Sequence, residues 1–237
     1  MHTIRIKTIP IFCLLCMIRF STVAQTVLLS VDRGTDSIPE QRGPNLKKNS
    51  HVFFNFGLVA GEDKPGSRII YGSSVEYGFG VRKKYKFSPL YSLGWELGLN
   101  GKVFKLKQDN GKTFPDTLLN DVERMDYGTA SVAFYNRFNF DPHRGNFMGT
   151  FLDLGFKGGW DFQVTHVIKN DLPGGSKIKS EITDLSYTNS FQYAVFARIG
   201  RSHLALYASY RLSKLFKSSY GYPELPRTTV GLEAAIF

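Results

Sequence analysis

In several stretches of the chain, ionisable side chains lie an even number of positions apart, in the same alternating phase as other polar residues. Asp153 and Asp161 share one such phase, and two carboxylates held in different environments can act as general acid and general base. Lys157 lies between them in the same phase, which favours ion pairing instead. The eleven ionisable members of these polar phases, five acids and six bases, are Glu76, Arg82, Glu96, Lys102, Arg137, Asp153, Lys157, Asp161, Arg198, Arg211 and Glu233. This near balance predicts a network of paired charges rather than a catalytic pair.

A hydrolytic site needs a nucleophile, a base and a carboxylate in one place. The stretch 165–184 contains His166, Ser176, Ser180 and Glu181, but a loop collects such residues by chance. The other three histidines after residue 24 are expected at the opposite side of the fold: His51, His143 and His203. No histidine pair has the spacing of zinc ligands, and no Asp-rich loop has a calcium-binding pattern. We therefore expect no catalytic residue, cofactor or metal, and a lipid-modifying enzyme is the weakest functional alternative.

Eight stretches alternate apolar and polar residues with a period of two, the pattern of a strand with two different faces. In the clearest, 148–164, the apolar phase runs from Leu152 through Phe156 to Phe162. Most of these stretches are longer than the roughly 5–6 residues of a soluble strand, and their apolar phases hold Phe, Tyr and Trp towards the ends, as in membrane barrels. The predicted strands are 51–60, 69–82, 91–104, 125–140, 148–164, 185–199, 203–214 and 227–237.

The connections between these stretches alternate in length. The connections expected on the outer side are 61–68, 105–124, 165–184 and 215–226, and those on the inner side are 83–90, 141–147 and 200–202. Short inner turns and long outer loops, with an even number of strands, are typical of bacterial membrane barrels. The Gly-rich run 173–177 follows no strand-to-helix pattern and is predicted to be a loop tip, not a phosphate cradle. The predicted fold class is all-β, a transmembrane antiparallel up-and-down β-barrel of eight strands.

The expected function follows from the width of such a barrel. No stretch of the chain after residue 24 approaches the 18 consecutive apolar residues that a membrane-spanning helix needs. A closed barrel is the other architecture that satisfies the hydrogen bonds of every backbone group in lipid. Eight strands leave a lumen only wide enough to be filled by side chains, so the balanced polar phases predict a plugged barrel. The leading hypothesis is a non-enzymatic barrel that is structural or serves as a binding or secretion accessory through its loops. The alternative is a narrow, porin-like channel for small solutes.

The N-terminus has the parts of a secretory signal peptide in the right order. Arg5 and Lys7 form a basic region, residues 9–18 form a short apolar stretch, and residues 22–24 (TVA) offer a cleavage site. Ten apolar residues are too few for a membrane-spanning helix. The sequence therefore predicts export and cleavage before Gln25.

The chain is predicted to have three parts: a signal peptide (1–24), a flexible periplasmic lead-in (25–49) and an outer-membrane β-barrel (50–237). Cys13 and Cys16 both lie in the first part, so the mature chain has neither a disulfide nor a thiolate metal site. The formal charge of +10 falls to +7 when the three bases of residues 1–24 are removed. For an exported protein we expect this charge to face outer-membrane lipid and lipopolysaccharide rather than nucleic acid.

Several short motifs resemble a known family: 134–139 (FYNRFN), 144–146 (RGN), 151–155 (FLDLG) and 210–216 (YRLSKLF), with a last strand that ends in Phe237. They resemble the outer-membrane β-barrel domain family of Bacteroidota, also described as PorT-like or porin-family proteins. The resemblance implies integral localisation in the bacterial outer membrane, and some members are accessories in protein secretion. The family has no site motif to carry over. A terminal Phe also implies recognition by the barrel-assembly machinery, although the apolar phase before it, Ala234 and Ile236, is not the phase of Phe237 itself.

Overall fold

The computed structural model describes residues 43–172 and 175–236. The predicted signal peptide, the lead-in up to residue 42 and Phe237 lie outside the described residues. The strands are β1 (Lys48–Ala60), β2 (Val75–Lys86), β3 (Tyr91–Leu106), β4 (Val122–Asn139), β5 (Thr150–Asp171), β6 (Lys177–Thr183), β7 (Phe191–Arg201), β8 (Leu204–Arg211) and β9 (Thr228–Ile236), with a short 3-10 helix η2 (Ser218–Tyr220). In the described part of the chain, no helix is long and apolar enough to cross a membrane.

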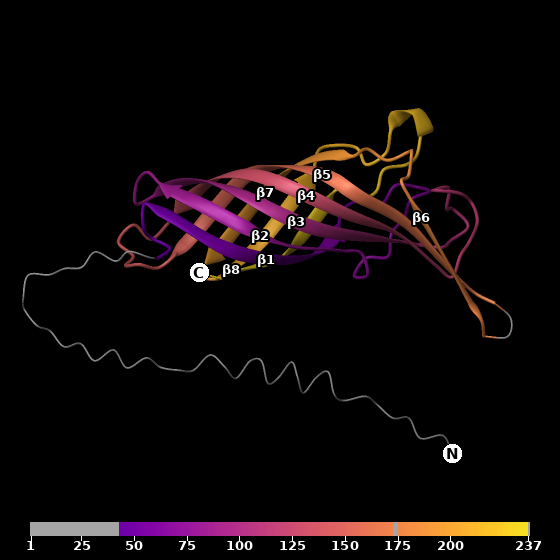
Figure 1. Ribbon diagram of the computed structural model, residues 1–237, viewed down its shortest axis with the longest axis horizontal. Helices are drawn as coiled ribbons and strands as arrows, with labels where there is room; N and C mark the ends of the chain where they lie inside the picture. The colour runs from indigo at the N-terminus through magenta and orange to yellow at the C-terminus, as the bar shows by residue number, and fades with distance from the viewer. Residues whose placement is uncertain (1–42, 173–174, 237) are drawn as a thin grey trace, which may run out of the picture. The chain divides into compact units, whose positions relative to one another are not determined.

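Eight of these strands form a closed barrel (Figure 1). Antiparallel pairing runs in the order β4-β3-β2-β1-β9-β8-β7-β5, and β4 pairs with β5 to close the ring. One end, which we call the turn end, has short connections at 87–90, 140–149 and 202–203. The other, the loop end, has the connections 61–74, 107–121 and 212–227 together with the β5–β6 hairpin. The predicted all-β, eight-stranded antiparallel barrel is confirmed, including the alternation of connection lengths.

The predicted start of the second strand is wrong. Residues 69–74 belong to the β1–β2 connection, where Ile69 makes only an isolated bridge to Leu106 and Gly72 adopts a φ of +78°. A left-handed residue interrupts a strand, because extended backbone needs a negative φ. β2 instead begins at Val75 and continues to Lys86.

The predicted start of the sixth strand, at residue 185, is wrong: the strand there is β7, which begins at Phe191, and a separate strand, β6, precedes it within the predicted outer loop. β6 and β7 pair with the same edge of β5: Thr183 lies opposite Thr165, and Phe191 opposite Trp160. Between them the chain leaves the sheet at Asp184, which has a φ of +54°. Residues 184–190 form a loop whose Leu185 and Tyr187 pack in the apolar cluster at the loop end. Residues 177–183, predicted as loop, therefore form β6, and residues 185–190, predicted as strand, form a loop.

A β-bulge on β5 reverses the face assigned to Gln163. Asp161 pairs with Thr129 and Gln163 pairs with Gly128, so Phe162 is an extra residue between them. An extra residue shifts the alternation by one position. Gln163, predicted to face the lumen, is therefore exposed, whereas Val164, predicted to face outwards, packs against the interior.

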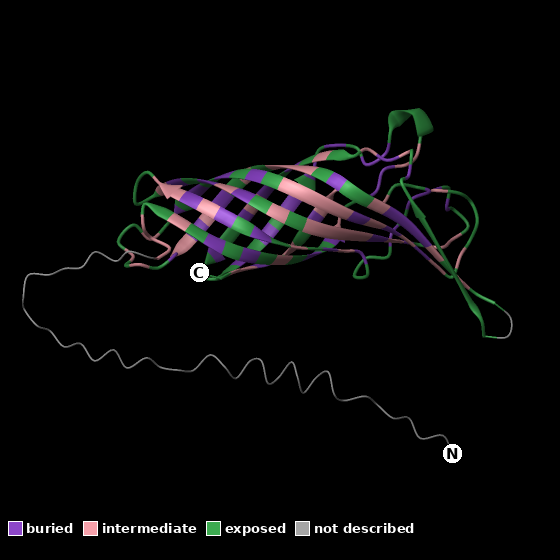
Figure 2. Ribbon diagram, in the orientation of Figure 1, coloured by how far each residue is buried: buried purple, intermediate pink, exposed green. Residues whose placement is uncertain are grey.

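Along every barrel strand, buried and exposed residues alternate (Figure 2). The outward phase forms a continuous belt of large apolar side chains, which we call the apolar belt. Its most exposed members include Phe54, Phe56, Tyr77, Phe79, Leu97, Leu99, Val132, Phe134, Leu154, Phe156, Trp160, Phe162, Phe191, Tyr193, Leu204, Leu206, Val230 and Leu232. Residues 122–127 of β4 and 163–171 of β5 extend beyond this belt at the loop end.

Apolar packing of the described residues is concentrated at the loop end rather than in the middle of the barrel. We call this cluster the loop-end core: Val59, Ile69, Phe104, Leu106, Phe114, Met125, Tyr127, Leu185, Leu215, Phe216 and Leu225. Phe114 from the β3–β4 connection lies 4.4 Å from Phe216 of the β8–β9 connection, measured between ring centroids. The long connections therefore pack on one another and on the ends of the strands at the loop end.

Candidate functional site

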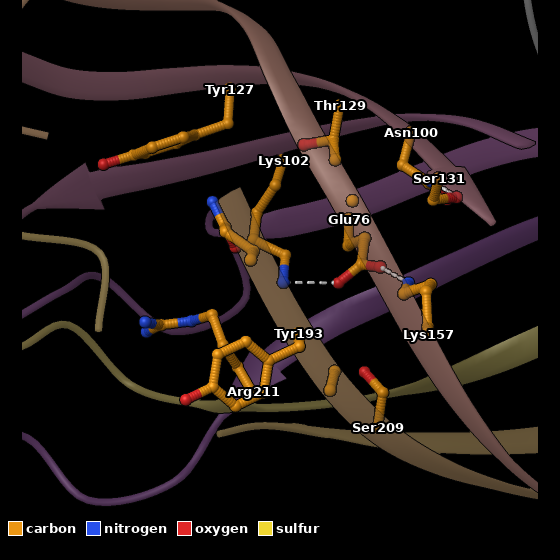
Figure 3. A pocket seen from close by; sticks show the side chains of 13 residues that line it. Glu76, Asn100, Lys102, Tyr127, Thr129, Ser131, Lys157, Tyr193, Ser209 and Arg211 are labelled. Carbon is orange, nitrogen blue, oxygen red and sulfur yellow. Dashed lines mark hydrogen bonds and ion pairs between the residues drawn. The ribbon is translucent and has the colours of Figure 1, made fainter. Parts of the chain in front are cut away.

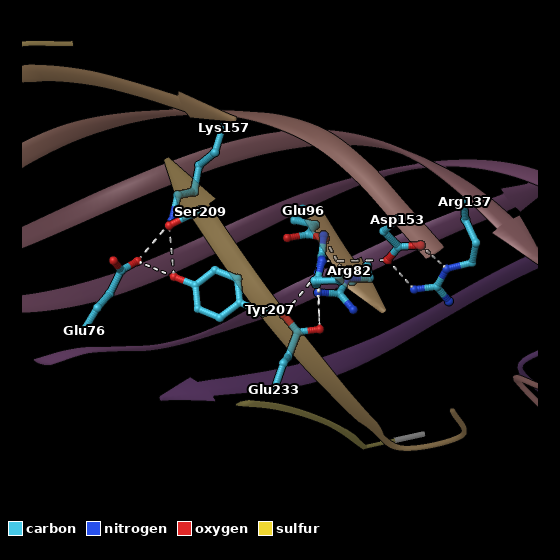
Figure 4. Close-up of polar contacts among 10 residues, drawn as sticks. Glu76, Arg82, Glu96, Arg137, Asp153, Lys157, Tyr207, Ser209 and Glu233 are labelled. Atoms are coloured by element: carbon cyan, nitrogen blue, oxygen red, sulfur yellow. Dashed lines mark hydrogen bonds and ion pairs between the residues drawn. The ribbon is translucent and has the colours of Figure 1, made fainter. Parts of the chain in front are cut away.

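Three arginines and three carboxylates form one connected set of ion pairs in the lumen near the turn end. We call it the arginine network: Arg82, Arg137, Arg198, Glu96, Asp153 and Glu233 (Figure 4). Arg82 lies 2.7 Å from an oxygen of Glu96 and 2.7 Å from one of Glu233. Arg137 donates two hydrogen bonds to Asp153, at 2.6 and 2.7 Å. All six side chains are buried. Equal numbers of opposite charges with direct hydrogen bonds are the condition under which buried charge is tolerated.

A second charged group surrounds Glu76, nearer the loop end. Lys102 Nζ lies 2.6 Å from Glu76 Oε2, and Lys157 Nζ lies 3.2 Å from Oε1. The hydroxyls of Tyr207 and Thr229 donate to the same carboxylate at 3.0 and 2.9 Å. These five residues, the Glu76 cluster, come from β2, β3, β5, β8 and β9, so one carboxylate joins strands from all sides of the barrel.

The free space between these groups is small. A cavity of about 40 Å³ lies beside Glu76, Lys102, Lys157 and Arg211 (Figure 3), and a second, of about 20 Å³, lies beside Glu96. A single buried water needs about 10–15 Å³ measured in this way. The two lumen cavities therefore have room for a few water molecules and none for an organic substrate.

An aromatic ring occupies the centre of the arginine network. Tyr135 is buried, and the guanidinium carbons of Arg82, Arg137 and Arg198 lie 5.6, 5.5 and 5.3 Å from its ring centroid. Such distances allow cation–π attraction. The ring lies over Gly94 on the neighbouring strand, where a Cβ would overlap it. Glycine at position 94 thus makes space for a large ring in a narrow lumen.

The turn end is covered by the first described residues of the chain. The ammonium of Lys84 donates to the carbonyl of Pro44, and that of Lys86 donates to the carbonyl of Asn45 at 2.6 Å. The Asn45 side-chain amide donates to the carbonyl of Gly145 in the β4–β5 turn at 2.8 Å. The last residues of the predicted lead-in are therefore bound to the turn end.

At the loop end, a buried carboxylate holds the β3–β4 connection. Glu123 lies in the part of β4 beyond the apolar belt, with Lys112 Nζ at 2.5 Å and His166 Nε2 at 2.8 Å. Burial alone would raise the pKa of Glu123, but hydrogen bonds from His166, Lys112 and Asn120 lower it below its usual value. The carboxylate is thus held charged, and we call this group the Glu123 cluster.

A second buried carboxylate holds the β8–β9 connection. Glu224 accepts a hydrogen bond from Arg211 at 2.7 Å and one from the backbone N–H of Leu215 at 3.0 Å. Arg211 also donates to the carbonyl of Leu225 at 3.0 Å. Glu224 therefore joins the two arms of the connection, and Arg211 ties the second arm to β8.

The structure places the sequence-predicted residues as follows. All eleven ionisable residues of the polar phases face the lumen, so this prediction is confirmed. His166, considered for hydrolysis, is buried against Glu123, whereas Ser176, Ser180 and Glu181 are exposed. Ser180 pairs with Ile168, whereas His166 pairs with Ile182. His166 and Ser180 are therefore not opposite each other in the β5–β6 ladder. Among the described residues, no group of three potential ligands could hold a metal ion.

Sequence reasoning missed the buried groups that order the loop end: Lys112, Glu123, Arg211 as a loop anchor, and Glu224. It also missed the inward aromatic residues, of which Tyr135 is the most central. A Lys or Glu in a polar loop looks the same in sequence whether it is solvated or buried. A Tyr in the polar phase of a strand, opposite a Gly on the next strand, is a signal that could have found Tyr135.

No family model matches the chain, and no curated protein matches it. Two crystal structures of Ail, the attachment invasion locus protein of Yersinia pestis, are similar to it. The one in complex with the heparin analogue sucrose octasulfate is 12% identical over 80% of this chain and 96% of that chain, with a TM-score of 0.34. The other is 13% identical over 82% and 95%, with a TM-score of 0.29. Likeness at this level carries no argument about function, and the barrel assignment rests on the closed strand pairing of this chain.

Proposed function

We propose that this protein is an integral barrel of the bacterial outer membrane, with a lumen closed by its own side chains. The observation that carries the proposal is the contrast between the two faces of the barrel. The outward face is a belt of large apolar residues on every strand, and the inward face is a network of paired charges. A soluble protein rarely exposes an apolar surface of this extent, whereas a barrel in lipid must do so.

The closed lumen argues against a solute channel. The arginine network, the Glu76 cluster and the loop-end core follow one another along the barrel, and the cavities beside them have room for only a few water molecules. Opening a path would leave buried charges without partners, at a cost of about 3–5 kcal/mol for each broken pair. We therefore place function on the loop end.

The loop end is suited to bind a partner. Its connections are held by Glu123 and Glu224 and pack on a shared core, so they offer a preorganised surface. Leu118, Leu119 and Tyr220 are large apolar residues exposed on these connections. We propose that the protein is non-enzymatic, serves as a binding or secretion accessory in the envelope, and belongs to the PorT-like barrel family of Bacteroidota. Lipid and lipopolysaccharide would surround it, and the barrel-assembly machinery would insert it.

Current recording in planar lipid bilayers tests the closed lumen. We expect no stable unitary conductance from the purified protein, under conditions in which a water-filled porin in the same bilayer gives clear steps. Long-lived steps of uniform size would overturn the proposal and favour the narrow channel. A partner for the loop end is tested by replacing Leu118 and Leu119 with Ser, which should release any stoichiometric envelope protein that co-purifies with the unmodified barrel.

A further inference from the structure

β6 is an edge strand that extends beyond the ring of eight. It is the last strand of the sheet order, and in the described part of the chain it pairs only with β5 (Figure 1). All seven of its residues are exposed. An edge strand of this kind presents unpaired backbone donors and acceptors, which natural proteins cover or blunt unless they use them.

The ladder with β5 shows which residues of β6 face the open edge. The N–H of Leu172 donates to the carbonyl of Ser176 at 2.8 Å, so these two residues form a hydrogen-bonded pair. Hydrogen-bonded and non-hydrogen-bonded pairs alternate along an antiparallel ladder. Ile178, Ser180 and Ile182 therefore direct their backbone groups to β5. The backbone groups of the remaining residues point to the open edge: Lys177, Lys179, Glu181 and Thr183.

The sequence of β6, KIKSEIT, is complementary to itself when it runs antiparallel. Full overlap of the seven residues with a second copy places Ser180 opposite Ser180. The same register places Lys179 opposite Glu181 on both sides of this centre. Ile178 then faces Ile182, so two apolar pairs lie on the other face. Opposite charges and apolar side chains that lie directly across a ladder both stabilise it.

The two neighbouring registers that keep the same backbone groups at the contact, centred on Lys179 and on Glu181, pair the side chains less favourably. Shifting the centre to Lys179 still pairs Lys177 with Glu181, but it places Lys179 opposite itself and Ile178 opposite Ser180, so both apolar pairs are lost. Shifting it to Glu181 places two carboxylates opposite each other. Like charges directly opposite one another destabilise a ladder. Overlap and apolar contact therefore both favour the register centred on Ser180, and of these three registers it is the one with no like charges opposite each other.

We propose that two copies of this protein associate through β6, as an antiparallel pair with Ser180 on the two-fold axis. The contact is isologous, because the same residues are used by both copies. It joins the two β5–β6 hairpins into one continuous sheet outside the barrels, the mode of strand addition at a free edge. The apolar belt and the lumen take no part in it, so this association is independent of whether the barrel conducts.

Cysteine cross-linking tests this register. Cys13 and Cys16 are the only native cysteines, and both lie in the predicted signal peptide, so in the mature chain one introduced thiol reports one contact. Because Ser180 directs its backbone groups to β5, Ser180 and its copy form a non-hydrogen-bonded pair in this register. The Cα atoms of such a pair are about 4.5 Å apart, within the range that a disulfide spans. Ser180→Cys should give a disulfide-linked dimer on mild oxidation in lipid vesicles. Lys177→Cys is the matched control, because its partner in this register is Thr183 and not itself.

A charge-swap series separates specific pairing from chance collision. In the Ser180→Cys background, Lys179→Glu should reduce the dimer at least fivefold, because it places two carboxylates opposite each other. Adding Glu181→Lys should restore it. The proposal fails if Ser180→Cys forms no more dimer than Lys177→Cys, or if the double swap does not recover the dimer. The heat-dependent shift in gel mobility of a folded barrel, unchanged in every variant, shows that the ring itself is intact.

Discussion

Lys157 on β5 and Glu76 on β2 contact each other across the lumen, with Nζ and Oε1 3.2 Å apart, although two strands separate them around the ring. Lys102 binds the other carboxylate oxygen at 2.6 Å, so one acid holds two bases. Both lysines would be left without their main partner if the carboxylate were removed. Glu76 is therefore the residue on which closure of the lumen nearer the loop end depends.

Replacing Glu76 with Gln should destabilise the barrel by about 3–5 kcal/mol, because it leaves buried positive charge uncompensated. Urea unfolding in lipid vesicles measures this free energy. Glu62→Gln, at an exposed position in the β1–β2 connection, is the matched control and should change it by less than about 0.5 kcal/mol. Adding Lys102→Gln to Glu76→Gln should recover part of the loss. Equal unfolding free energies for Glu76→Gln and the control would show that the cluster does not hold the lumen closed.

Gly94→Ala should destabilise the barrel by about 1–3 kcal/mol, the usual cost of overpacking. The new Cβ would overlap the ring of Tyr135 and displace it from Arg82, Arg137 and Arg198. Gly158→Ala is the control, since a Cβ there meets no atom within 4 Å. The same unfolding experiment checks both, and a Gly94→Ala variant as stable as Gly158→Ala would mean that the ring is free to move.

Acidification should loosen the loop end before the barrel unfolds. The pKa of Glu123 is lowered in the folded protein, so its contribution to stability is complete above the usual value of 4.5 and is lost as the pH falls through the lower, folded value. Hydrogen exchange of residues 107–121 should therefore stay slow from neutral pH down to about 4.5, after correction for the intrinsic rate, and accelerate only below it.

Glu123→Gln is the control for this pH effect. Gln cannot carry the charge that pairs with Lys112, so the connection should exchange faster at neutral pH and show no further step on acidification. A loop that loosens at the same pH in both proteins would assign the transition to another group. A loop that is protected equally at every pH would contradict the anchoring role of Glu123.

The period-two pattern predicted the strands well because it reflects a local and repeated constraint. Each barrel residue faces either outwards or into the lumen, so Phe134 and Arg137 are assigned by their neighbours alone. The division between β6 and β7 was not predictable in this way. It depends on the left-handed turn at Asp184 and on packing of Leu185 in the loop-end core, with partners that are far away in the sequence.

The loop-end anchors escaped prediction for a related reason. Glu123 is 43 residues from His166, and Arg211 is 13 residues from Glu224. Pairing at such separations depends on which loops fold over which strand ends, and no periodic pattern encodes it. The lumen charges were predictable as a set, but their partners were not, because Arg198 reaches Glu96 across the barrel rather than along a neighbouring strand.

Tryptophan fluorescence tests the central claim most directly, that the apolar belt lies in lipid. The chain has two tryptophans, Trp95 and Trp160, and both lie in the outward phase of barrel strands. In vesicles made with lipids brominated along their acyl chains, we expect strong quenching of both, read separately in Trp95→Phe and Trp160→Phe, and little quenching by aqueous iodide. Emission that iodide quenches and brominated lipid does not would contradict the account.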